Sequence, residues 1–144
     1  FTSNGCQYIS APIICYESIY SDYVTEYVRK GANLLFIITN DGWWQDTPGY
    51  KQHFAFARIR AIENRRSIAR SANTGISGFI DQKGDVISKT EWWKPDAISA
   101  TINANNSETL FTKFPYLIGV IAVISTFILL LLTTVQLWRK KSAK

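Results

Sequence analysis

Cys15 is the residue whose type and position are best suited to covalent chemistry. It follows a short apolar run, Tyr8–Ile14, and precedes a helix start marked by Ser21-Asp22. A thiol near a helix N-terminus ionises more readily, and the thiolate is the nucleophilic form. Glu17 has the opposite effect, because a nearby carboxylate disfavours a second negative charge. Cys15 would therefore need a nearby cation to react near neutral pH.

Two other roles for Cys15 stay open. A buried cysteine is commonly inert and acts as a small hydrophobic residue. Cys6 is the only other cysteine, so the two could instead form a disulfide in an oxidising compartment. Two Cys and a single His are too few for a structural zinc site, which takes four such ligands. We expect neither a metal nor a cofactor.

His53 is the only histidine, and a Cys–His pair is one way to activate a thiol. It lies in the first turns of a helix expected to begin at Thr47-Pro48, and no spacing connects it with Cys15. The sequence therefore favours a structural or surface role for His53 over a catalytic one.

Aromatic and basic side chains are the remaining candidates. Trp43 follows the turn at residues 40–42, and we predict that Trp43 and Asn40 line a substrate pocket. Trp92-Trp93 suits core packing and substrate contact equally well. The arginines from Arg58 to Arg70 are interpreted as a solvated helix face with ion pairs.

Strands and helices alternate along the globular part. Tyr8–Ile14 and Leu34–Ile38 are predicted strands, and the second has the continuous apolar run typical of a strand buried on both faces. Between them, Ser21-Asp22 and Gly31 mark the start and the end of a helix. A second helix is predicted from Thr47-Pro48, with an apolar stripe that comprises Phe54, Ala57, Ala61 and Ile62.

Three further strands are predicted at Ser67–Ala72, Ile76–Ile80 and Val86–Ser88, and the last two form a hairpin. The order strand, helix, strand, helix, strand indicates a sheet that starts parallel, with right-handed crossovers. In such sheets ligands bind beyond the carboxyl ends of the strands. Cys15–Glu17 and Asn40–Trp44 should then face one crevice.

The longest uncharged stretch, residues 114–138, predicts a membrane span, because its 25 residues include no Asp, Glu, Lys or Arg. A helix of this length covers about 38 Å, more than the roughly 30 Å of a hydrocarbon core. Four basic residues follow within residues 139–144, so the positive-inside bias predicts a cytoplasmic C-terminus. Residues 1–113 are then expected on the periplasmic side of a bacterial inner membrane.

Composition excludes several other classes of protein. With 47% hydrophobic and 19% charged residues, the chain can build a core, unlike a disordered chain. The net charge is +5, but the C-terminal tail carries four of the positive charges, so no nucleic-acid partner is expected. The chain contains no Met, which suggests a processed or truncated piece of a longer protein.

Four segments together carry a resemblance to a known family. They are Ile13–Glu17 (Ile-Ile-Cys-Tyr-Glu), Thr39–Trp44 (Thr-Asn-Asp-Gly-Trp-Trp), Gln52-His53 with Ala57–Asn64, and Arg70–Ser77. In this order the chain resembles the apolipoprotein N-acyltransferases, membrane-embedded members of the nitrilase (carbon–nitrogen hydrolase) superfamily, over about residues 8–90. A membrane helix after the catalytic domain also fits that family and does not fit soluble nitrilases.

The resemblance implies an α/β fold class. Residues 1–113 would be the C-terminal part of a nitrilase-like αββα sandwich, 114–138 a transmembrane helix and 139–144 a basic cytoplasmic tail. It also implies a Glu–Lys–Cys triad in which Cys15 matches the nucleophile and Tyr16 and Glu17 match functionally important neighbours. The Glu and the Lys lie upstream in family members and match no segment here. We therefore expect them upstream of Phe1, and we expect the 144 residues alone to be inactive.

The implied reaction moves a fatty acyl chain from a phospholipid, through a Cys15 thioester, to the N-terminal amino group of a diacylglyceryl-cysteine apolipoprotein. The implied partners are the phospholipid donor, the apolipoprotein acceptor and the membrane. Two alternatives stay open: a membrane-anchored nitrilase-type amidase, and a catalytically inactive, membrane-tethered binding domain.

Overall fold

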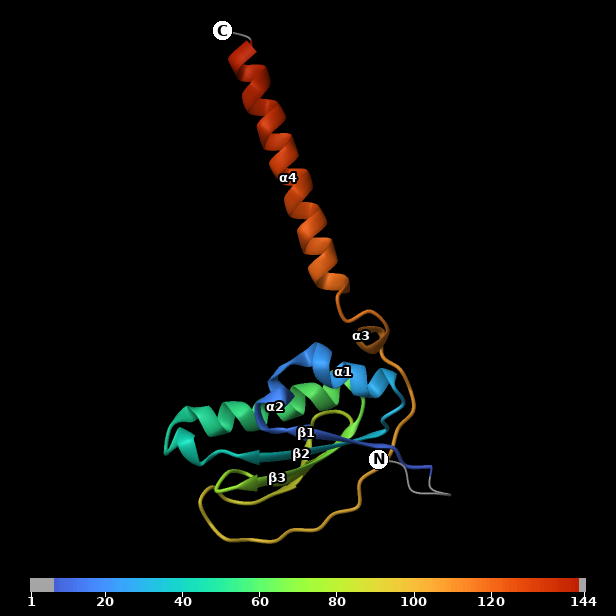
Figure 1. Cartoon of the computed structure of the whole chain (residues 1–144), viewed down its shortest axis with the longest axis vertical. Helices are drawn as coiled ribbons and strands as arrows, with labels where there is room; N and C mark the ends of the chain where they lie inside the picture. Colours follow the sequence, from blue (N-terminus) through green and yellow to red (C-terminus); the bar gives the residue numbers. More distant parts are fainter. Residues whose placement is uncertain (1–6, 143–144) are drawn as a thin grey trace. The chain divides into compact units, whose positions relative to one another are not determined.

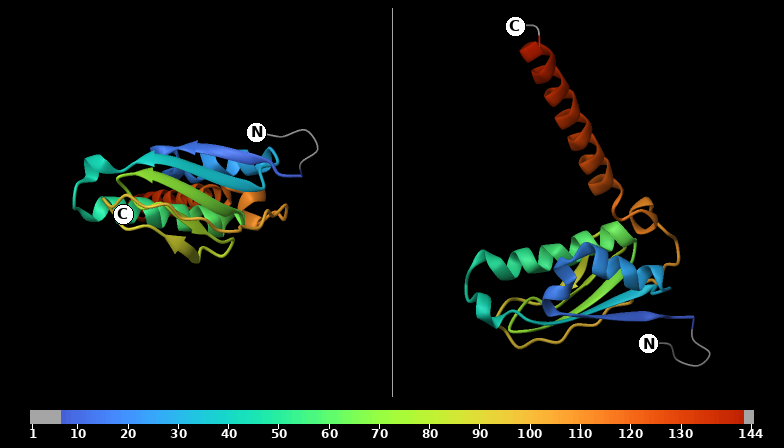
Figure 2. Two further views of the ribbon diagram at one scale, coloured as in Figure 1. Left: turned by 90° about the horizontal axis from the view of Figure 1, so that it is seen from below. Right: turned by 45° about the horizontal axis from the view of Figure 1, so that its top comes forward.

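The computed structural model describes residues 7–142, and its contacts divide the chain into two compact units. One unit ends at Lys113 and is a mixed α/β domain, and the other begins at Phe114 and contains one long helix. In the α/β domain, helices α1 (Ser21–Arg29) and α2 (Pro48–Asn64) lie on the same face of a sheet (Figures 1 and 2).

The sheet has five strands in the spatial order β1-β2-β3-β4-β5. They are β1 (Ser10–Ile14), β2 (Leu34–Asn40), β3 (Ser67–Asn73), β4 (Gly78–Ile80) and β5 (Val86–Lys89). The first three strands are parallel to one another, β4 is antiparallel to β3, and β5 is antiparallel to β4. This confirms the predicted parallel start and the predicted hairpin. Pro12 lies in β1 at the sheet edge, where a residue without an N–H interrupts fewer ladder hydrogen bonds.

Local signals account for the helix ends. The hydroxyl of Thr47 accepts a hydrogen bond from the Gly49 N–H (3.4 Å), and Pro48 occupies the first turn of α2. Gly31 follows α1 with a φ of +100°, a conformation that residues with a Cβ rarely adopt. Short 3-10 helices, η1 (Cys15–Ile19) and η2 (Gly42–Trp44), follow β1 and β2 directly. A single turn, α3 (Leu110–Lys113), ends the domain.

The core lies between the sheet and the two helices. Its fully buried side chains include Ile13, Leu35, Ile37, Ile68 and Ile80 from the strands and Val24, Ala57 and Ala61 from the helices. The apolar run in β2 differs from the prediction of a strand buried on both faces. Within the described residues Leu35 and Ile37 are buried, whereas Phe36 and Ile38 are 37% and 54% exposed. A shallow groove of about 440 Å³ lies on this second face.

Two predictions for α2 and its surroundings are wrong. Ile62, assigned to the buried stripe, is exposed. Arg60, Arg66 and Arg70, assigned to a solvated face, are buried. Their charges are accommodated because each has a partner inside the protein. Arg60 forms an ion pair with Glu63, Arg66 donates to four backbone carbonyls, and Arg70 donates to a carboxylate.

The second unit is dominated by α4 (Leu117–Ser142). The 20 residues Leu117–Gln136 have a mean hydropathy of 2.6, so the helix is long and apolar enough to cross a membrane. Four hydroxyls of the helix donate to carbonyls three or four residues back, as Thr126 does to Ala122 (2.8 Å), so their polar hydrogens are satisfied within the helix. The helix begins three residues later than the predicted span.

Candidate active site

Cys15 stands where β1 ends and η1 begins. Its backbone φ is +51°, a left-handed conformation that is unusual for a residue with a side chain and costs on the order of 1–3 kcal/mol. Glu17 braces the turn, since its carboxylate accepts from the Ile14 N–H (2.7 Å) and from the Tyr23 hydroxyl (3.2 Å). Surrounding contacts thus hold Cys15 in a conformation that the residue would not adopt by itself.

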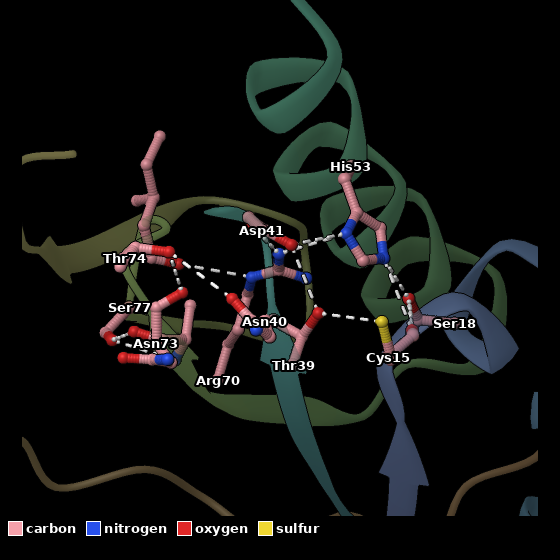
Figure 3. A network of polar contacts seen from close by, with 12 residues as sticks. Cys15, Ser18, Thr39, Asn40, Asp41, His53, Arg70, Asn73, Thr74 and Ser77 are labelled. Carbon is pink, nitrogen blue, oxygen red and sulfur yellow. Dashed lines mark hydrogen bonds and ion pairs between the residues drawn. The ribbon is translucent and has the colours of Figure 1, made fainter. Parts of the chain in front are cut away.

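The carbonyl of Cys15 is held from a second side. It accepts a hydrogen bond from the Ser18 hydroxyl (2.8 Å) and lies 3.3 Å from His53 Nε2 (Figure 3). Ser18 Oγ and His53 Nε2 are themselves 3.0 Å apart, and both side chains are buried. His53 is therefore buried inside the domain, in line with the structural role that the sequence favoured. It nevertheless contacts the backbone of Cys15, although no spacing in the sequence connected the two residues.

Asp41, directly after β2, is the buried acceptor that holds this network together. Its carboxylate is fully buried and receives Arg70 Nη2 on Oδ2 (2.6 Å) and His53 Nδ1 on Oδ1 (2.9 Å). Because the carboxylate can only accept, Nδ1 carries the proton of that contact. Burial alone would raise the pKa of Asp41, but the hydrogen bond from His53 and the charge of Arg70 outweigh it and hold this pKa below the ordinary value.

Thr39 connects the same carboxylate with the sulfur atom. Its hydroxyl lies 3.3 Å from Cys15 Sγ and 3.1 Å from Asp41 Oδ1 (Figure 3). The register of the parallel strands explains this closeness: Ile14 pairs with Ile38, so the next residue of each strand falls side by side. The carboxyl ends of β1 and β2 therefore meet as predicted, with Cys15 and Asp41 at one rim.

The loop after β3 fits tightly against this rim. A Cβ atom at Gly75 would overlap the Asp41 carboxylate, so no larger residue fits there without a shift. Asn40 accepts hydrogen bonds from the Gly42 N–H (3.1 Å) and the Thr74 hydroxyl (3.4 Å). Its carbonyl oxygen is thus used to join the two loops.

An aromatic pocket of about 360 Å³ adjoins the Cys15 turn and is lined by Tyr16, Trp43 and Trp44. The Tyr16 ring stacks on Trp44 with centroids 6.2 Å apart and lies 5.7 Å from the His53 ring. Trp43 is 76% exposed. The structure therefore brings together Tyr16 and Trp43 in one pocket, next in the chain to Cys15, whereas Asn40 is not among the residues that line this pocket.

Other predicted features fall outside the site. Trp92 stacks on Tyr50 at 4.9 Å and packs against the core. Among residues 7–142, no group of three or more His, Cys, Asp or Glu side chains is placed to hold a metal ion. The thiol of Cys15 is free, and Cys6, its possible disulfide partner, lies outside the described residues.

Sequence reasoning missed Thr39, Ser18 and Arg70. The strand register would have placed Thr39 beside Cys15, but it requires knowing that β1 and β2 are neighbours. Arg70 reaches Asp41 across the β2–β3 pair, and nothing in the arginine-rich stretch distinguished it from the other arginines, of which Arg58 and Arg65 are exposed.

The fold and the site define a class of protein. Residues 2–110 match the carbon–nitrogen hydrolase family, and the chain belongs to that family. Among curated relatives, the chain is 43% identical over 119 residues to the apolipoprotein N-acyltransferase of Chlorobaculum tepidum, which covers 82% of this chain and 22% of that protein. It is 34% identical over 119 residues to the apolipoprotein N-acyltransferase of Thermotoga maritima, covering 80% of this chain and 24% of that protein. The resemblance carried by the four segments is thus confirmed, and the chain spans less than a quarter of either relative.

Solved structures support the same fold. A carbon–nitrogen hydrolase from Helicobacter pylori superposes with a TM-score of 0.55 at 14% identity, over 60% of this chain and 37% of that one. An amidase from Nesterenkonia, with an acetamide moiety added covalently at its active-site cysteine, superposes with a TM-score of 0.51 at 18% identity, over 60% and 35%. These likenesses establish the nitrilase-type fold of the α/β domain.

Proposed function

We propose that this chain is the cysteine-bearing part of an apolipoprotein N-acyltransferase and that Cys15 is its nucleophile. The observation that carries the proposal is the placement of the Cys15 thiol. It stands at the carboxyl end of β1 in a left-handed conformation that Glu17 and Ser18 brace, and Tyr16, the next residue, lines an aromatic pocket. The identity with two named N-acyltransferases supports the reaction class.

The proposed reaction has two steps that share one thioester. In the first, Sγ of Cys15 attacks the ester carbonyl carbon of a phospholipid, the C–O bond breaks, and the lysophospholipid leaves as an alcohol that takes up the thiol's proton. In the second, the amino group of a diacylglyceryl-cysteine apolipoprotein attacks the thioester. An amide forms, the C–S bond breaks, and the proton lost by the amine restores the thiol.

Proton transfer and charge stabilisation require groups besides Cys15. We assign the general base to a Glu and the cation to a Lys in the remainder of the full-length enzyme. We assign to the backbone N–H of Tyr16, directly after the nucleophile, the role of helping the Lys to stabilise the oxyanion. On this view the 144 residues alone have no activity.

The aromatic pocket and α4 suit lipid substrates. Tyr16, Trp43 and Trp44 give the pocket an almost wholly apolar lining, which suits an acyl chain better than a small polar amide, and Tyr16 directly follows Cys15 in the chain. An apolar helix would keep the enzyme at the bilayer that holds both substrates. The basic residues that follow the apolar segment Leu117–Gln136 favour a cytoplasmic C-terminus and a periplasmic active site at the inner membrane.

The test compares the full-length protein with Cys15→Ala, both in membranes. Phospholipid with a radiolabelled acyl chain should label the wild type through a bond that hydroxylamine cleaves, and a diacylglyceryl-cysteine peptide should then remove the label as an N-acyl product. C15A should do neither. Acyl transfer by C15A would refute the proposal, hydrolysis of small amides without peptide acylation would indicate an amidase, and binding without turnover would indicate an inactive tethered domain.

A further inference from the structure

The proposed mechanism leaves the hydroxyl of Thr39 without a role, although it is a side-chain group in hydrogen-bond contact with the sulfur. It lies 3.3 Å from Cys15 Sγ and 3.1 Å from Asp41 Oδ1, both within bonding range for their atom types. A hydroxyl has one proton to donate. Thr39 can therefore donate to the sulfur or to the carboxylate at any moment, but not to both.

Asp41 does not depend on Thr39 for its stability inside the protein. Arg70 Nη2 donates to Oδ2 at 2.6 Å, and His53 Nδ1 donates to Oδ1 at 2.9 Å. These contacts hold the pKa of Asp41 below its ordinary value. When the Thr39 proton turns away, the buried carboxylate keeps two donors, so the turn leaves no unpaired buried charge.

The charge on the sulfur decides which way the proton points. A neutral thiol is a weak acceptor, and its own S–H can donate to Thr39 Oγ1, so the Thr39 proton then belongs to Asp41. A thiolate is a charged acceptor, and hydrogen bonds to charged groups are roughly twice as strong as neutral ones. Deprotonation of Cys15 therefore draws the hydroxyl toward the sulfur.

We propose that Thr39 is a catalytic residue whose hydroxyl donates to the Cys15 sulfur whenever that sulfur is negatively charged. This inference rests on Cys15 being the nucleophile. No atom is transferred to or from Thr39: its proton stays on Oγ1 and only rotates, while the thiol proton passes to the general-base carboxylate. The same donation stabilises the sulfur as attacking thiolate in the first step and as leaving thiolate in the second.

Three variants of the full-length protein in detergent test this inference, each in a Cys6→Ser background. Thr39→Val keeps the branched shape and removes the hydroxyl, and Thr39→Ser keeps the hydroxyl. Thr25→Val is a matched control, because Thr25 is buried like Thr39 and its hydroxyl has no hydrogen-bond partner among the described residues. The rate at which iodoacetamide alkylates Cys15 is measured by peptide mass spectrometry at pH 7 and pH 10.

At pH 7 we expect alkylation of T39V to be about tenfold slower than that of the wild type, the loss of one hydrogen bond to a charged group. T39S should stay within about twofold and T25V should be unchanged. At pH 10 T39V should approach the wild type, since hydroxide then supplies the thiolate without help. A structural role alone would not produce this dependence on pH.

Three results would overturn the inference: equal rates for T39V and wild type at pH 7, the same deficit at both pH values, or a T39S as slow as T39V. Thr39→Ala gives the same comparison if T39V does not accumulate in a folded form. The proposed function is tested separately, because acyl transfer by C15A would refute it whatever the alkylation rates are.

Discussion

Arg66 and Arg70 are both buried and lie four residues apart, yet their side chains bind different kinds of acceptor. Within the described residues, Arg66 donates only to backbone carbonyls, those of Ala32, Asn64, Arg65 and Ser107, at 2.7 to 3.4 Å. It joins segments that are distant along the chain. Arg70 donates to the Asp41 carboxylate and so belongs to the network that ends at Cys15. Burial alone therefore does not separate a structural arginine from one that supports the site, and the identity of its acceptors does.

The largest expected effects come from replacing each arginine with methionine, which has a similar length and no charge. Both Arg66→Met and Arg70→Met should lower the free energy of unfolding by about 3 kcal/mol, since each leaves buried acceptors without a donor. Only R70M should also slow alkylation of Cys15 in the folded protein, by about tenfold. Urea denaturation and the alkylation rate, both on the full-length protein, separate the two quantities. Slowed alkylation in R66M would remove the distinction.

A smaller loss is expected from Gly75→Ala. The added methyl group would overlap the Asp41 carboxylate, so the loop or the carboxylate must shift, at a cost of about 2 kcal/mol. Alkylation of Cys15 should slow with it, because Asp41 positions both Thr39 and His53. Gly119→Ala is the control, since a Cβ there meets no atom of residues 7–142 within 4 Å and should leave both measurements unchanged.

Acid should weaken the Arg70 network and leave the Arg66 contacts intact. Folding lowers the pKa of Asp41, through His53 and Arg70 against the effect of burial, so the fold favours its charged form. This contribution to stability is complete above the ordinary value of 3.8 and is lost as the pH falls from there through the lowered value. Unfolding midpoints of wild type and Asp41→Asn should therefore converge below pH 3.8. A constant gap down to pH 2 would contradict this assignment.

The sequence was informative where local rules apply. Apolar runs located β1, β2 and the hairpin, and Thr47-Pro48 located the start of α2. The rule that ligands bind at the carboxyl ends of parallel strands placed Cys15 and residues 40–44 at one rim before any contact was known.

The positions of His53 and of the other buried polar residues could not be predicted, because they depend on tertiary contacts that reverse the usual pattern of apolar residues inside and polar residues outside. On α2, the polar residues His53 and Asn64 face inward, while the apolar residues Ile59 and Ile62 are exposed. Periodicity reads the apolar side of a helix as its inner side, so it could not identify His53 as a neighbour of Cys15. Buried polar residues escape such patterns because their partners, such as Asp41, come from other strands.

The smallest expected effect concerns Asn40, which was predicted to line a pocket and whose side chain joins two loops. Asn40→Ala should lower the free energy of unfolding by about 1 kcal/mol, because it loses the bonds to Gly42 and Thr74, and should leave the preference for acyl-chain length unchanged.

Trp43→Ala should have little effect on stability, because the side chain is mostly exposed, but should raise the KM for long-chain phospholipid donors. Comparing KM for donors of different chain length in the full-length enzyme distinguishes the two residues. A changed chain-length preference in N40A would show that Asn40 does line the substrate pocket. The end of β2 next to Asp41 would then contact the substrate directly.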